Sequence, residues 1–112
     1  MNESQQKLLE INELITNLKK ELPDEMNAFM HFSQQTEKAG AIQTKDKALI
    51  NVALAVSAQC EWCITLHVKN AIDAGATEQE VLEAAMQAVL MHGGPALMYI
   101  IQVKHAIANL TQ

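Results

Sequence analysis

Apolar residues recur at helical spacing in the first third of the chain, which predicts two helices. In the first helix they lie between polar residues, at Leu8, Ile11, Leu14 or Ile15, and Leu18. This pattern stops at Leu22, because Pro23 disfavours continuation of a helix. Pro23 instead opens a second helix, which Gly40 is expected to close as a C-terminal cap. Its expected apolar face comprises Met26, Phe29, Met30 and Phe32.

The middle of the chain predicts one deeply buried helix and a second helix after it. Thr44 is the expected N-cap of the buried helix, which should run to about Ala58 or Gln59. Residues 48–56 leave it almost no polar face, so we expect it to be buried nearly all round. The next helix is expected from about Cys60 to Ala74, ended by Gly75.

The last third of the chain predicts two more helices. Thr77 and Glu80 form a capping box, in which each side chain satisfies the other residue's unpaired backbone amide. A helix therefore starts there, and Gly93 and Gly94 end it. Pro95 opens a final helix to Leu110 that carries apolar residues on most of its circumference. One small domain can hardly cover that surface alone, so we expect self-association.

The composition also predicts an all-α protein. About half of the 112 residues are apolar (49%) but only 4% are aromatic, so the core must consist of Ala, Val, Ile, Leu and Met. Such a mixture favours closely packed helices. The length and the absence of any linker predict one domain, residues 1–112, with about six helices.

Charge and hydropathy indicate which partners and which cellular location to expect. The net charge is −5 and all eight basic residues are lysines, so the chain lacks the guanidinium groups and basic cluster typical of nucleic-acid binding. The polar N-terminus has no signal-peptide core, and no apolar run approaches the ~20 residues that cross a bilayer. We therefore expect a cytoplasmic protein without a membrane or nucleic-acid partner. In that reducing compartment, a close cysteine pair is better explained by redox chemistry or metal binding than by a permanent disulfide.

The two cysteines, Cys60 and Cys63, are followed by His67 one helical turn later. The start of a helix favours thiolates, because its backbone N–H groups and dipole point at them. His67 lies on the same helical face as Cys63 and can exchange a proton with it, which favours Cys63 as nucleophile and Cys60 as resolving cysteine. In thioredoxin-type pairs the first cysteine attacks instead, and the charge of Glu61 opposes thiolate formation. The order of attack therefore stays open.

Two other fates of the cysteine pair are a zinc site and an inert pair in the core. A structural zinc site built on Cys60, Cys63 and His67 needs a fourth ligand, and no second Cys-x-x-Cys exists. The remaining histidines, which we expect at the surface or as satisfied helix residues, are His31, His92 and His105. We favour redox chemistry, with no bound metal and no cofactor. An inert pair would simply fill space.

The residues resemble the small cysteine-containing members of the carboxymuconolactone decarboxylase and alkylhydroperoxidase D (AhpD) superfamily. The resemblance spans about residues 24–110. It rests on Lys47–Ile50, Ala53–Ser57, Cys60–His67, Ala74–Thr77 with Glu80, and Gly93–Leu97.

This resemblance implies an AhpD-like helical fold that assembles into a homo-oligomer, a homotrimer or homohexamer. It also implies a thiol peroxidase or disulfide reductase that uses a hydroperoxide or disulfide substrate and a thiol reductant. In peroxide-reducing relatives, the cysteine that matches Cys63 attacks the hydroperoxide, the one that matches Cys60 resolves the sulfenate, and the histidine that matches His67 relays a proton. The decarboxylase branch typically lacks the pair, so the motif favours the redox branch.

The chain departs from the peroxidase pattern at two positions. The relay glutamate twelve residues before the first cysteine is Ala48 here, and a histidine between the cysteines is replaced by Trp62. Losing a positioned general base typically costs on the order of 10²–10⁴ in rate, so we expect weak hydroperoxide turnover. Candidate substitutes are Glu61, Glu37 and Asp46, although Asp46 is not on the helical face of position 48.

The leading hypothesis is therefore an alkylhydroperoxidase, or peroxiredoxin-like, oxidoreductase that cycles Cys60 and Cys63 between dithiol and disulfide. Its alternative is a non-enzymatic oligomeric scaffold or small-ligand-binding protein of the same fold, in which the cysteines belong to the core. In that case, Trp62 and the apolar residues around it would determine ligand uptake.

Overall fold

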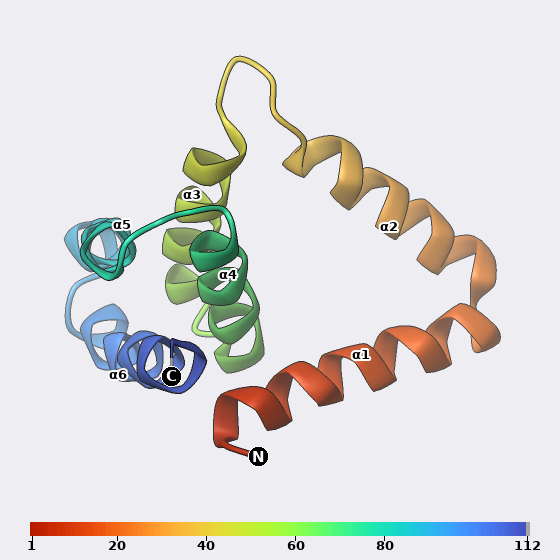
Figure 1. Cartoon of the computed structure of the whole chain (residues 1–112), viewed down its shortest axis with the longest axis horizontal. Coiled ribbons are helices and arrows are strands. Elements are labelled where there is room, and N and C mark those ends of the chain that lie inside the picture. The colour runs from red at the N-terminus through yellow and green to blue at the C-terminus, as the bar shows by residue number, and fades with distance from the viewer. Residues whose placement is uncertain (112) are drawn as a thin grey trace.

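The protein folds into six α-helices in the computed structural model, which describes residues 1–111 (Figure 1). The helices are α1 (Glu3–Glu21), α2 (Pro23–Glu37), α3 (Thr44–Ser57), α4 (Glu61–Asp73), α5 (Glu78–His92) and α6 (Gly94–Leu110). No strand occurs among the described residues. The all-α prediction and the number of helices are therefore confirmed.

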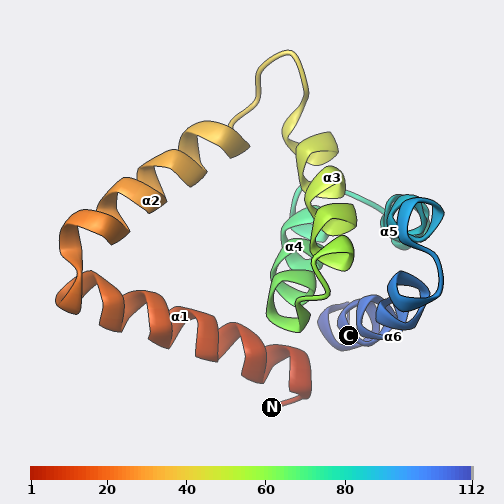
Figure 2. The same ribbon diagram turned by 180° about the vertical axis from the view of Figure 1, so that it is seen from behind.

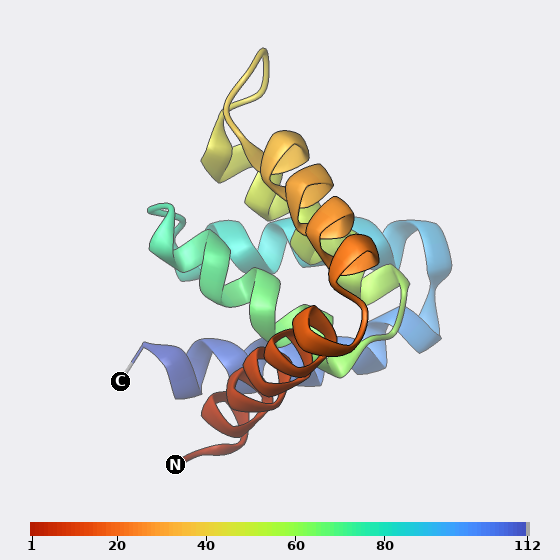
Figure 3. The ribbon, with the colours of Figure 1, turned by 90° about the vertical axis from the view of Figure 1, so that its right-hand side faces the viewer.

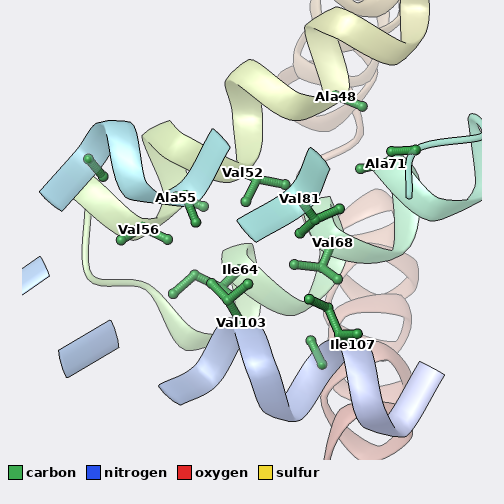
Figure 4. Close-up of a cluster of buried hydrophobic side chains, with 14 of the residues drawn as sticks. Ala48, Val52, Ala55, Val56, Ile64, Val68, Ala71, Val81, Val103 and Ile107 are labelled. Atoms are coloured by element: carbon green, nitrogen blue, oxygen red, sulfur yellow. The ribbon is translucent and has the colours of Figure 1, made fainter. Parts of the chain in front are cut away.

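Helices α3 to α6 pack around one hydrophobic core, shown in Figure 4. Its largest fully buried apolar side chains are five valines and one isoleucine, namely Val52, Val56, Ile64, Val68, Val81 and Val103. Alanines of all four helices fill the spaces between them, at positions that include Ala55, Ala71, Ala85 and Ala106. Because these side chains are short, the helix backbones approach one another closely, as the composition predicts.

Helices α1 and α2 stand outside this core, as Figures 1 and 2 show from opposite sides. No residue of α2 is buried, and in α1 only Ser4 is. The beginning of α1 is tied to the end of α6, because the Asn2 side-chain amide donates to the Asn109 carbonyl at 3.0 Å and the Asn109 amide donates to the Ser4 hydroxyl at 3.0 Å. In Figure 3 the two termini accordingly lie close to each other. Both helices thus form an arm that is anchored at its N-terminal end.

The prediction that Gly40 caps α2 is wrong. The helix ends at Glu37, and Lys38 is the C-cap with extended backbone. The Lys47 ammonium of α3 donates to the carbonyls of Thr36 and Lys38, at 3.0 and 2.7 Å. A residue of the next helix therefore satisfies two carbonyls at the end of α2, and no glycine is needed.

The expected N-cap of α3 is also displaced by one residue. Gln43 occupies the cap position, makes no side-chain capping bond, and is followed by Thr44 as the first helical residue. Two local signals are confirmed elsewhere. Thr77 and Glu80 form the reciprocal capping box, and Gly75, which ends the turn after α4, has the positive φ (96°) that favours glycine.

Several large apolar side chains are exposed on the single chain, against two expectations. Helix α3 is not buried all round, since Ile50 and Leu54 are 46% and 59% exposed. Phe29 and Phe32 on the expected apolar face of α2 are exposed as well. Helices α5 and α6 add Met86, Leu90, Met91, Leu97, Met98 and Ile101. An apolar surface of this extent on three neighbouring helices is typical of a contact face.

Replacing the cap of α5 should destabilise the protein without altering the core. Thr77→Ala removes the hydroxyl that accepts from the Glu80 amide at 3.1 Å, so the free energy of unfolding should fall by about 1 kcal/mol. Denaturant titration followed by circular dichroism measures this loss. Thr77→Ser keeps the acceptor oxygen and should restore nearly all of the stability. Equal stability of the Ala and Ser variants would contradict a capping role.

Candidate redox site

A tight turn joins the end of α3 to the start of α4 and contains the first cysteine. The Gln59 backbone has a left-handed φ of 55°, and the Cys60 amide donates to the Ala55 carbonyl of the preceding helix at 3.4 Å. Cys60 is then the N-cap of α4, with extended backbone. The position of this cysteine is therefore set by the end of one core helix and the beginning of the next.

Cys60 and Cys63 form a disulfide across the first turn of α4. Their Cα atoms are 5.2 Å apart, and the Cys63 amide donates to the Cys60 sulfur at 3.2 Å. Both residues are half-buried. A reduced Cys60 sulfur at this position would face the positive end of the helix, which favours the thiolate. Neighbouring Glu61 opposes that effect by like charge.

His67 lies one turn after Cys63 on the same face of α4, as its spacing predicts. Its imidazole is half-buried, and its Nδ1 atom is buried without a hydrogen-bond partner among the described residues. Burial lowers the pKa of His67 below its usual value, and the charge of Glu37 raises it by a smaller amount. The structure therefore favours a neutral imidazole at neutral pH, and this form can accept a proton.

Trp62 points away from the core between the two cysteines. It is 47% exposed, and its indole N–H donates to the Glu10 carboxylate of α1 at 3.0 Å. Together with Glu61 and the first turns of α1, it lines a cleft of about 400 Å³. Trp62 thus connects the cysteine turn to the N-terminal arm, a role that no local sequence signal indicates.

Ala48 is buried and lines a cavity of about 350 Å³ between α2, α3 and α4. The polar lining residues are Glu37, Thr44, Lys47, Asn51, Asn70 and Asp73. Among the proposed substitutes for the relay glutamate, Glu37 lies here, whereas Glu61 lines the cleft beside Trp62. Asp46 is exposed and belongs to neither lining. Sequence reasoning missed the cavity, although Asn51 interrupts the otherwise apolar run of residues 48–56 in α3.

The other three histidines are at the surface, as expected. His31, His92 and His105 are exposed, and His105 lies 4.0 Å from the Glu3 carboxylate. Within residues 1–111, no three His, Cys, Asp or Glu side chains have an arrangement that could hold a metal ion. The same part of the chain has no helix with the length and hydropathy of a membrane span.

A model of the carboxymuconolactone decarboxylase family matches residues 23–105. The chain belongs to this family. The family includes decarboxylases and alkylhydroperoxidases, and the Cys60–Cys63 pair is compatible with redox activity. The resemblance stated from the sequence is therefore confirmed.

Two relatives of this family member are uncharacterised proteins. Uncharacterized protein 4 in the cox locus of Paracoccus denitrificans is 41% identical over 70 residues, which cover 62% of this chain and 63% of that protein. The chain thus matches less than two thirds of that relative's length. Uncharacterized protein H16_B0147 of Cupriavidus necator is 33% identical over 93 residues, which cover 83% of this chain and 82% of the relative.

Solved structures share the fold. Apo-lpg0406, a carboxymuconolactone decarboxylase family protein from Legionella pneumophila, superposes over 100% of both chains with a TM-score of 0.95 and 34% identity. A Thermotoga maritima protein of the same family, for which a part in the antioxidative response has been suggested, has a TM-score of 0.77 and 20% identity. That match covers 95% of this chain and 87% of the other. The AhpD-like helical fold is therefore confirmed.

Burial of His67 should make stability depend on pH. Its native pKa lies below the unfolded value of about 6.5, so the unfolded chain takes up the proton first as the pH falls. The free energy of unfolding should therefore decrease from about pH 6.5 downward, through the lower native pKa. Urea unfolding of the oxidised protein across this range measures the slope. His67→Gln should make it shallower, and an unchanged slope would contradict the assignment.

Proposed function

We propose that this protein is a thiol oxidoreductase of the alkylhydroperoxidase type, in which Cys60 and Cys63 alternate between dithiol and disulfide. The observation that carries the proposal is the disulfide across the first turn of α4, with His67 one turn further on the same face. Family membership and the helix N-terminus support it. The antioxidative role suggested for the Thermotoga protein, which shares the fold, belongs to the same class of chemistry.

The proposed cycle begins with the reduced protein. His67 takes the proton of the Cys63 thiol, and the thiolate attacks the terminal oxygen of a hydroperoxide, ROOH. The O–O bond breaks, Cys63 becomes a sulfenic acid, and His67 returns its proton to the leaving alkoxide to give ROH. The Cys60 thiol then attacks the Cys63 sulfur, which forms the disulfide and releases water. An external dithiol restores both thiols and is itself oxidised to a disulfide.

The reaction is expected to be slow, because Ala48 occupies the place of the relay glutamate in peroxide-reducing relatives. In the reducing cytoplasm, where we expect the protein to act, thiol reductants would regenerate the dithiol form. The disulfide of a partner molecule is an alternative oxidant for the same dithiol. A reaction with such a disulfide would differ from the peroxide reaction only in the molecule that oxidises Cys60 and Cys63.

Peroxide consumption in the presence of a dithiol donor tests the proposal. Cys63→Ser should abolish turnover because it removes the attacking sulfur. Cys60→Ser should abolish turnover too, but it should leave a Cys63 sulfenic acid that a trapping reagent detects by mass spectrometry. Ala48→Glu should raise the rate, by up to about 10²-fold if a positioned base is restored.

The Cys60→Ser and Cys63→Ser pair serves as its own control, since the two variants lose the same disulfide. If sulfenic acid forms on Cys60 in Cys63→Ser and not on Cys63 in Cys60→Ser, the order of attack is the reverse. If neither variant traps the acid and the parent never forms a reversible disulfide, the redox proposal fails. The scaffold or ligand-binding alternative would then apply.

We further propose that the functional unit is a homo-oligomer, a trimer or hexamer. The exposed apolar residues of α3, α5 and α6, among them Leu54 and Leu90, support this assembly. A charged residue there would lose its hydration in a contact between copies.

Introducing a charge on the apolar face should break the assembly. Leu90 is 77% exposed on the single chain, so Leu90→Lys should leave the fold intact and shift the molecular mass toward that of a monomer. Sedimentation velocity measures the mass, and circular dichroism checks the fold. Leu14→Lys, at a position 57% exposed on α1, is the matched control. A monomeric parent protein would refute the proposal.

A further inference from the structure

The hydrogen bond between Trp62 and Glu10 joins the cysteine turn to the N-terminal arm. Trp62 lies within residues 60–63, the segment that the disulfide closes. Its indole N–H donates to the Glu10 carboxylate of α1 at 3.0 Å. Figures 1 and 2 show the first turns of α1 beside the start of α4. A chemical change at the cysteines therefore takes place next to a contact that holds α1 on the core.

Helix α1 has few other attachments to the rest of the protein. Ser4 is its only buried residue, and the hydrogen bonds of Asn2 and Ser4 with α6 hold only its beginning. Leu8 and Ile11 are half-buried, and they line a cavity of about 220 Å³ against α4. A helix that buries so little surface opens locally at a small free-energy cost. The Trp62 contact therefore affects how firmly α1 is docked.

The disulfide fixes the backbone that carries Trp62. It joins the N-cap residue of α4, Cys60, to Cys63 in the first turn. Without it, this turn would be held by two hydrogen bonds to Cys60, from the Cys63 amide to the sulfur at 3.2 Å and from the Ile64 amide to the carbonyl at 2.9 Å. A cross-link reduces the number of conformations that the closed segment can adopt. Reduction should therefore leave the Trp62 indole less firmly directed toward Glu10.

Reduction would also add charge to a cleft that is already acidic. The cleft beside Trp62 is lined by three carboxylates and one ammonium, those of Glu3, Glu10, Glu61 and Lys7. In the disulfide, both sulfurs are uncharged. In the dithiol form, the N-terminus of α4 favours the thiolate of Cys60, which is the residue next to Glu61. This negative charge would repel the Glu10 carboxylate and so weaken the docking of α1.

Building on the proposed dithiol–disulfide cycle, we propose that the docking of α1 on Trp62 is coupled to the oxidation state of Cys60 and Cys63. The disulfide form holds α1 docked. An external dithiol passes two electrons and two protons to the cysteine sulfurs and becomes a disulfide, while the Cys60–Cys63 bond breaks. Cys60 then loses its proton to water, and the first turns of α1 leave Trp62.

This coupling opens the Trp62 side of the cysteine turn in the state that reacts with an oxidant. A hydroperoxide or a partner's disulfide takes up the two electrons, the Cys60–Cys63 bond forms again, and α1 returns. Coupling between two equilibria is reciprocal. A docked α1 therefore favours the disulfide by the same factor by which the disulfide favours docking.

Hydrogen exchange of the full chain, with and without excess dithiothreitol, tests the coupling. Backbone amides of α1 should exchange about fivefold faster in the reduced protein, because local opening sets their exchange rate. Alkylation followed by mass spectrometry confirms the oxidation state of the cysteines. Helix α5 makes no contact with α1 and is the internal control, so its exchange should not change. An equal acceleration in α1 and α5 would show general destabilisation and overturn the inference.

Three variants separate the hydrogen bond from the charge. Trp62→Phe removes the indole N–H, so α1 should exchange fast in both states, and the equilibrium with dithiothreitol should shift about fivefold toward the dithiol protein. Glu10→Gln keeps an acceptor oxygen but removes the charge, so the difference between the two states should shrink. Glu13→Gln is the matched control, because Glu13 is exposed on α1 and does not line the cleft. It should keep the full difference.

The outcomes distinguish this coupling from the proposed activity. Equal exchange of α1 in the oxidised and reduced proteins overturns the inference, even if peroxide is consumed. Exchange that depends on the oxidation state, in a protein without peroxide turnover, supports the coupling and rejects the peroxidase activity alone. A disulfide that excess dithiothreitol does not reduce in the folded protein overturns both proposals.

Discussion

The close packing of α3 against α4 is the constraint on which the rest of the structure depends. The two helices run in opposite directions, because the short turn through Gln59 joins the end of one to the start of the other. Small and β-branched residues such as Val52, Ala55 and Val68 bring their backbones together at zero or nearly zero exposure. This packing leaves the cysteine turn at one end of the helix pair and the polar cavity at the other. His67 lies between them.

The sequence predicts those parts of the fold that short-range physics determines. The Thr77–Glu80 capping box and the Gly75 turn involve residues at most a few positions apart, and the structure contains both. The disulfide pair and its N-cap position likewise follow from local spacing. Local conformational preferences decide such features before any tertiary contact forms.

The failed predictions involve contacts with another helix or with surfaces outside the single chain. Gly40 is not the end of α2, because Lys47 satisfies the last carbonyls from another helix. Neither a glycine signal nor helical periodicity reveals such a bond. The burial of α3 was overestimated for a related reason, since apolar periodicity identifies a face that avoids water but not what covers it. Ile50 and Leu54 are as apolar as their buried neighbours, and they are exposed on the single chain. The hydrogen bond from Trp62 to Glu10 joins residues 52 positions apart in the sequence.

The absence of a carboxylate at position 48 has an energetic consequence for the proposed site. A glutamate at position 48 would stand in the wall of the core, where Ala48 is only 8% exposed, and its charge would lose much of its hydration. A carboxylate at the cavity mouth keeps its water and remains ionised at little cost, but its field at His67 is weaker because solvent screens it. Glu37 at the cavity mouth therefore costs the fold less stability than a glutamate at position 48 would, and it acts on His67 more weakly. At His67, burial lowers the pKa, and the charge of Glu37 raises it by a smaller amount. A neutral imidazole beside a half-buried sulfur is ready to accept a proton, and it holds the resulting charge only weakly, which matches a slow thiol oxidoreductase.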